Sequence, residues 1–179
     1  MDKLIDDLIK LAFAEDIGDG DHTTLCCIPE TAMGKSQLII KEDGVLAGVE
    51  MAKRIFHDFD PELKMTVFIQ DGAEVKKGDI AFVVEGKIQS LLQTERLMLN
   101  VMQRMSGIAT TTRKYAKALE GTKTHVLDTR KTTPGMRMID SGDTFHRFSQ
   151  KTLNFHCRIS PERIGYSDMR NSRITNILH

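Results

Sequence analysis

The sequence lacks the features by which several classes of protein are recognised. It contains no tryptophan and only four prolines, and its 25 basic residues balance its 25 acidic ones. With no net charge and no alternation of aromatic and basic residues, we expect no nucleic-acid partner. No run approaches the roughly 18 apolar residues of a membrane span, so we expect no membrane partner. The first seven residues mix acids with apolar side chains, which is not the pattern of a signal peptide.

Cysteine is scarce, and the motifs of common active sites are absent. Cys26, Cys27 and Cys157 are odd in number and lack the spacing of a metal site, which predicts free thiols and a cytoplasmic protein. No Walker loop and no Gly-x-Gly-x-x-Gly motif occurs, and no Ser-His-Asp triad can be identified from the sequence. The acidic segment at 15–24 lacks the ligand spacing of a calcium loop and is expected to be a loop. We therefore name no catalytic residue and no metal ligand.

Hydrophobic periodicity predicts an α/β protein. Apolar residues make up 40% of the chain, enough for a packed core. Helical spacing of these residues indicates helices at 2–14 and 49–59, and strands are expected at 36–41, 64–70 and 80–85. From Gln89 onward, Met98, Met102 and Met105 fall on one stripe of a long helix, and we expect this stripe to belong to the core. Ser106-Gly107 is expected to interrupt that helix before a second one at 109–119.

Three cations lie close together at 128–137, in the segment DTRKTTPGMR. They are Arg130, Lys131 and Arg137, and they follow a predicted strand that ends at 124–127. In α/β folds, substrates bind at the carboxyl ends of the strands, and buried cations there need an anionic partner. The segment is predicted to bind a carboxylate or phosphate. The alternative is a solvated basic turn punctuated by Pro-Gly.

Arg104 is a further candidate for the same site. It stands between Met102 and Met105 near the predicted end of the long helix, and its planar fork suits a carboxylate. The alternative is a cation in the last turn that interacts with the helix dipole. Together with the cations at 128–137, Arg104 would suit a substrate with two or more negative charges. Glu95-Arg96 and Asp128 are candidate internal counter-ions.

Five motifs occur in an order that resembles the quinolinate phosphoribosyltransferase family, also called nicotinate-nucleotide pyrophosphorylase (carboxylating). They are EDIGDGDHTT at 15–24, GVLAG at 44–48, ERLMLN at 95–100, QRMSGIAT at 103–110 and DTRKTTPGMR at 128–137. Each motif alone is weak, but together they are specific. The resemblance extends from the N-terminus to about Met138, roughly three quarters of the chain.

The resemblance implies an enzyme of two domains. An N-terminal α/β sandwich would occupy 1–107, and residues 108–138 would begin an α/β barrel that is incomplete in this chain. Such enzymes are homodimers with shared active sites that transfer phosphoribose from phosphoribosyl pyrophosphate to quinolinate, with Mg²⁺. They release pyrophosphate and CO₂ and form nicotinate mononucleotide for NAD biosynthesis. By this resemblance, Arg104 would reach a substrate carboxylate in the neighbouring subunit, and Thr129, Arg130 and Lys131 would line the quinolinate pocket.

The sequence departs from the family pattern after Met138. Residues 139–179 are expected to form a divergent tail, as in a truncated or frameshifted gene product. In the tail, Arg163 with Arg173 faintly echoes a His-Arg segment of the family but lacks its histidine. Arg137, Arg163 and Arg173 are further candidates for substrate binding. Two alternatives stay open: an inactive remnant that dimerises or binds anions weakly, and a related phosphoribosyltransferase-like protein for another carboxylated ring.

Overall fold

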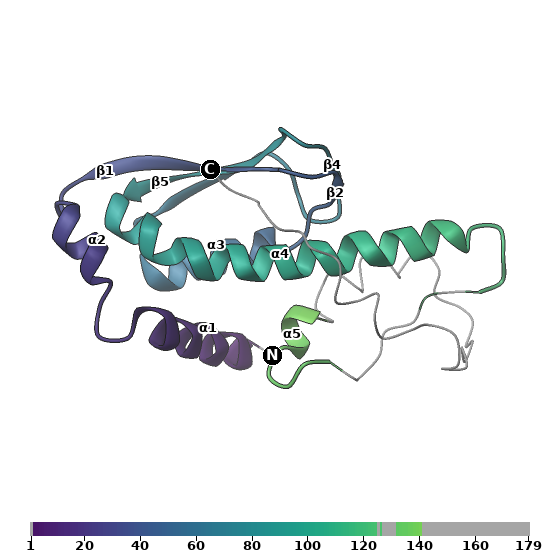
Figure 1. Cartoon of the computed structure of the whole chain (residues 1–179), viewed down its shortest axis with the longest axis horizontal. Helices are drawn as coiled ribbons and strands as arrows, with labels where there is room; N and C mark the ends of the chain where they lie inside the picture. Colours follow the sequence, from purple (N-terminus) through teal and green to yellow (C-terminus); the bar gives the residue numbers. More distant parts are fainter. Residues whose placement is uncertain (1, 125, 127–131, 141–179) are drawn as a thin grey trace.

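A computed structural model describes residues 2–124, 126 and 132–140 of the chain. A sheet lies on one side of the long helix α4, and the N-terminal helix α1 lies on the other (Figure 1). The helices are α1 (Asp2–Ile17), α2 (His22–Cys27), α3 (Val49–Phe59), α4 (Ile88–Ala118) and α5 (Arg137–Asp140). The strands are β1 (Met33–Ile39), β2 (Gly44–Val45), β3 (Lys64–Val67), β4 (Glu74–Val75) and β5 (Ile80–Lys87).

The main sheet is antiparallel and has three strands in the order β1-β5-β3. In β1, Met33 pairs with Lys87, and the register shifts between Leu38 and Ile39. β2 and β4 form a separate antiparallel pair. The chain is thus a mixed α/β protein, which confirms the predicted fold class. Within the described residues both sheets remain open.

The core lies between the sheet and the helices α3 and α4. The apolar stripe predicted for α3 is buried, because Val49, Ala52, Ile55 and Phe56 are at most 3% exposed. α3 approaches α4 closely at Gly48, whose φ is +100°. A Cβ at Gly48 would lie 3.1 Å from Met105 Sδ and 3.3 Å from Met102 Cα. Glycine there satisfies both a left-handed backbone and a close helix contact.

Helix α4 is continuous, which corrects the expectation that Ser106-Gly107 interrupts it. It extends from Ile88 to Ala118 as one helix of 31 residues. Ser106 is buried, and its hydroxyl donates to the carbonyl of Ala47 and accepts from the N–H of Ala47, both at 3.0 Å. Gly107 is buried as well. These small residues allow the segment before α3 to approach the helix, so they serve packing and not chain reversal.

The N-terminal segment also differs from expectation. α1 ends at Ile17, beyond the predicted residue 14, and the predicted loop at 15–24 contains the start of α2. The Asp21 carboxylate accepts a hydrogen bond of 3.1 Å from the Thr24 N–H and so caps α2. A helix of six residues is too short to show a helical repeat of apolar residues, so the sequence pattern did not indicate α2. None of the helices in the described part of the chain is long and apolar enough to cross a membrane.

Candidate anion-binding site

Arg104 projects from the well-packed part of α4. Its neighbours Met102 and Met105 are 1% and 6% exposed, whereas the side chain of Arg104 is 41% exposed. The buried neighbours fix the backbone from which the guanidinium emerges. Because α4 continues to Ala118, Arg104 lies in mid-helix, and the alternative of a cation in the last helical turn is wrong.

The guanidinium is held along one edge by Asp140. Arg104 Nε donates to Asp140 Oδ1 at 2.5 Å, and Arg104 Nη2 donates to Asp140 Oδ2 at 3.0 Å. Nη2 also donates to Thr133 Oγ1 at 2.8 Å. A planar fork on a carboxylate is the strongest common geometry for such a pair. The contact joins residues 36 positions apart in the sequence.

Asp140 is the better-buried partner of this pair. Its side chain is 11% exposed, and its Oδ2 also accepts a hydrogen bond of 3.2 Å from the Thr133 N–H. The Asp140 carboxylate raises the pKa of Arg104 by hydrogen bonding, so the guanidinium stays charged at every relevant pH. The site therefore offers a permanent cation whose orientation is set by a fixed carboxylate.

The segment 132–140 is anchored beside α4. Gly135 has φ of +79° in the turn, and the Met136 N–H donates to the Thr133 carbonyl at 2.9 Å. The short helix α5 follows, and its Ile139 is 3% exposed within the core cluster. Figure 1 shows α5 next to α4, on the side opposite the sheet. The end of the predicted basic segment thus meets Arg104.

The structure places only two of the predicted substrate-binding residues. Arg104 has the contacts described above, and Arg137 is exposed in the first turn of α5. Thr129, Arg130, Lys131, Arg163 and Arg173 lie outside the described residues, as does Asp128. Their roles stay predictions.

Sequence reasoning missed the counter-ion of Arg104. Glu95-Arg96 was a candidate, but Arg96 Nε pairs with Asp16 at 3.3 Å, and Asp140 takes the role at Arg104. The available signal was weak: an acid three residues beyond Arg137, just past the point where the recognised motifs end. An acid at that spacing is common on any short helix.

No magnesium ligand is assigned in the part of the chain that the structure describes. There, no three His, Cys, Asp or Glu side chains come together in a group that could hold a metal ion. Mg²⁺ usually keeps several waters and is bound by one or two carboxylates together with substrate phosphates.

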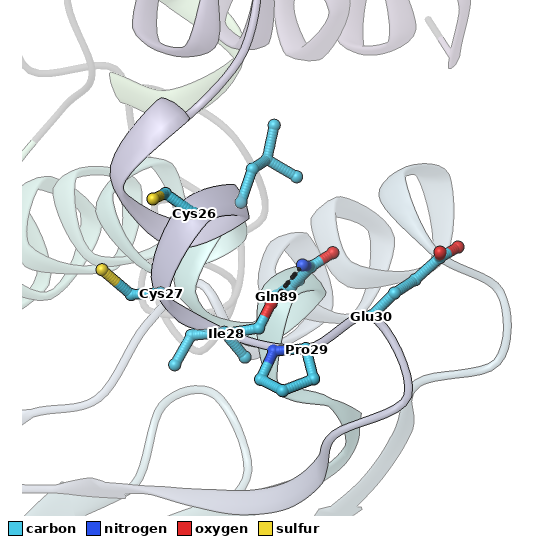
Figure 2. A pocket seen from close by; sticks show the side chains of 7 residues that line it. Cys26, Cys27, Ile28, Pro29, Glu30 and Gln89 are labelled. Carbon is cyan, nitrogen blue, oxygen red and sulfur yellow. Dashed lines mark hydrogen bonds between the residues drawn. The ribbon is translucent and has the colours of Figure 1, made fainter.

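A pocket of about 500 Å³ lies away from Arg104, beside α2 and the first turn of α4. Its lining consists of Leu25, Cys26, Cys27, Ile28, Pro29, Glu30 and Gln89 (Figure 2). The Gln89 amide donates one hydrogen bond of 2.7 Å to the Ile28 carbonyl. Glu30 is the one charged residue of this lining, and a carboxylate repels anions. None of the predicted substrate-binding residues lines this pocket.

Two family models match consecutive parts of the chain. The N-terminal domain model of quinolinate phosphoribosyl transferase matches residues 21–106, and the C-terminal domain model matches residues 108–144. The two matches meet within α4, three residues beyond Arg104.

Named relatives and solved structures agree with these matches. Quinolinate phosphoribosyltransferase [decarboxylating] 1 of Nicotiana glauca is 46% identical over 134 residues, which are 74% of this chain and 38% of that protein. The chloroplastic nicotinate-nucleotide pyrophosphorylase [carboxylating] of Oryza sativa subsp. japonica is 45% identical, over 74% of this chain and 36% of that protein. The crystal structure of NadC from Streptococcus pyogenes superposes with a TM-score of 0.74 at 38% identity, over 78% of this chain and 50% of that one. The chain spans less than half the length of these curated relatives.

Proposed function

Because this chain belongs to the quinolinate phosphoribosyltransferase family, we propose that it acts in phosphoribosyl transfer from phosphoribosyl pyrophosphate to quinolinate. The products would be nicotinate mononucleotide, pyrophosphate and CO₂, in NAD biosynthesis. The match covers 38% of the relative from Nicotiana glauca, so the activity that this relative is named for is a proposal for this chain.

The observation that supports this proposal is the oriented cation at the surface of α4. Arg104 presents a charged, partly exposed guanidinium on a rigid base, and Thr133 within the basic segment contacts it. Quinolinate carries two carboxylates, which require convergent cations. The proposed role of Arg104 is to bind one of these carboxylates. In a shared site, Thr129, Arg130 and Lys131 of one subunit and Arg104 of the other are proposed to form the pocket.

The chemistry proposed for the site needs positioning and charge more than a protein nucleophile. Departure of pyrophosphate builds positive charge on the ribose carbon, and fixed cations hold the quinolinate carboxylates while its ring nitrogen attacks. Mg²⁺ would accompany phosphoribosyl pyrophosphate and neutralise its phosphates. A homodimer that shares its sites is part of the same proposal, with Arg104 serving the neighbouring subunit.

We propose a cytoplasmic location on the basis of the thiols. Cys26 and Cys27 are exposed and form no disulfide, as expected in a reducing compartment. The relative from Oryza sativa is named as chloroplastic, and one from Nicotiana tabacum as mitochondrial, so location differs within the family. Cell fractionation with an antibody to the chain tests this point; recovery in an organelle would overturn it.

The decisive experiment measures quinolinate binding to the purified chain by calorimetry. Arg104→Ala should weaken binding at least about tenfold, because one charge-assisted fork is lost. Arg96→Ala is the matched control, since Arg96 is an exposed arginine of α4 paired with Asp16. Equal weakening by both variants, or no effect of Arg104→Ala, would contradict the assignment. Nicotinate mononucleotide followed by mass spectrometry, with phosphoribosyl pyrophosphate and Mg²⁺ added, tests turnover.

A further inference from the structure

The two edges of the Arg104 guanidinium are used differently. Asp140 occupies the edge formed by Nε and Nη2, through contacts of 2.5 and 3.0 Å. The second hydrogen of Nη2 faces Thr133 Oγ1 at 2.8 Å. Among the described residues, the two N–H groups of Nη1 have no acceptor. An arginine has five N–H donors in fixed directions, so the three contacts determine where the remaining two point.

The carboxylate is the fixed partner of this pair. Asp140 is 11% exposed, whereas Arg104 is 41% exposed. Asp140 follows the buried Ile139 on α5 and accepts the Thr133 N–H at 3.2 Å. A long arginine side chain loses rotamer freedom when it is held. Here the more exposed Arg104 is held by the less exposed Asp140. Asp140 thus defines the orientation of Arg104.

We propose that Asp140, together with Thr133, is a positioning residue that fixes Arg104 with its Nη1 donors directed at the substrate carboxylate. This inference rests on the proposed function and deepens it. The arginine would meet the substrate through Nη1, while its other edge stays on Asp140. Pre-orientation lowers the entropy lost on binding, and small displacements of a binding group have large effects.

A competing role for Asp140 has the opposite consequence. A carboxylate that blocks Arg104 would have to leave before substrate could bind, and its removal would strengthen binding. A positioning carboxylate stays, and its removal weakens binding. The burial of Asp140 and its second bond to the Thr133 backbone favour the positioning role.

The test compares quinolinate affinity of the whole chain with that of Asp140→Asn, which keeps the shape and removes the charge. We expect about tenfold weaker binding by calorimetry, as for other residues that orient a binding group. Asp140→Glu should recover part of the loss. Asp6→Asn is the matched control, because Asp6 also holds the Nε and Nη2 of an arginine, Arg54, at 3.1 and 2.5 Å. Tighter binding by Asp140→Asn, or an equal loss in Asp6→Asn, would overturn the proposal.

A second readout keeps the proposal separate from the proposed function. The Arg104 Nε–H signal in a nitrogen-15 NMR spectrum should be protected from exchange in the unmodified chain and exposed in Asp140→Asn. Equal protection in both would overturn the positioning role, whether or not quinolinate binds. Failure of the unmodified chain to bind quinolinate would contradict the proposed function alone. Should Asp140→Asn fail to fold, Thr133→Val removes only the hydroxyl acceptor of Nη2, and unchanged affinity there would count against the proposal.

Discussion

The two parts of α4 are held in different ways. The buried residues of the helix all lie between Ser90 and Ala109, and residues 110–118 are half-buried or exposed. The first part packs on α3 and the sheet, whereas the second extends past the sheet (Figure 1). At the start of the second part, Thr110 accepts a hydrogen bond from the Val45 N–H, and beyond it ion pairs with Glu74 of β4 connect the helix to the rest of the described protein.

This difference determines where a precise binding group can be placed. Arg104 belongs to the part that the core holds, between Met102 and Met105. A close-packed core holds the backbone of a helix in place, whereas exposed ion pairs contribute little to holding it. The candidate site therefore lies on the well-packed part of α4, where one face of the helix is buried and the face that carries Arg104 is open to solvent.

Truncation of a buried methionine should have the largest effect. Met102 is 1% exposed and lies where Gly48 packs closely against α4. We expect Met102→Ala to lower the free energy of unfolding by about 2–5 kcal/mol through lost burial and a cavity. Urea unfolding monitored by circular dichroism measures it. Lys114→Ala, on the exposed part of α4, should change it by less than about 0.5 kcal/mol. Similar losses in the two variants would contradict the difference between the two parts.

Periodic apolar residues made the core of this fold predictable. The helix predicted at 49–59 has the observed bounds of α3, Val49–Phe59. The predicted stripe of Met98, Met102 and Met105 is buried as expected. The continuity of α4 was not predictable in this way. Serine and glycine commonly interrupt helices, but here both residues are buried against the segment before α3, and Ser106 bonds to Ala47, 59 residues away in the sequence.

Removal of the Ser106 hydroxyl should have an intermediate effect. Ala47 is 1% exposed, so in Ser106→Ala its N–H and its carbonyl would both lose a partner without gaining water. We expect a loss of about 1–3 kcal/mol in the free energy of unfolding. Thr110→Val is the comparison, because the half-buried Thr110 accepts a single bond of 2.9 Å at its Oγ1, from the N–H of the buried Val45. A smaller loss in Ser106→Ala, which removes two bonds, than in Thr110→Val, which removes one, would show that the number of orphaned backbone groups does not set these energies.

The sequence indicated the cation of the candidate site, Arg104, but not the contacts that orient it. Arg104 was recognised from its residue type and its apolar neighbours, since a charged fork between buried residues needs an anionic partner. Asp140 was missed because the pairing depends on how the turn at Gly135 and the buried Ile139 return the chain to α4. Long-range contacts of this kind follow from tertiary packing and leave no local pattern in a single sequence.

Loss of the Glu74 carboxylate should have the smallest effect on global stability and a clear local one. Lys117 Nζ lies 2.9 Å from Glu74 Oε1, and Arg113 Nη1 lies 4.0 Å from it. The hydrogen bond from Lys117 lowers the pKa of Glu74 below its ordinary value of 4.5. A lowered folded pKa means that the contribution of this pair is present above pH 4.5 and is lost as the pH falls through the lowered value.

Glu74→Gln should therefore increase amide hydrogen exchange in residues 111–118, with little change in the melting temperature. Acidification below the lowered pKa of Glu74 should likewise reduce the protection of these amides relative to their intrinsic exchange rate in the unmodified chain. About 1 M salt should do the same, because exposed ion pairs are weak and screened. Glu62→Gln is the control, since Glu62 pairs at 3.1 Å with Lys87, just before the buried part of α4. There the core holds the helix, and exchange should stay slow. If Glu62→Gln instead increases exchange along 90–106, the first part of α4 also depends on its surface charges, and the distinction between the two parts fails.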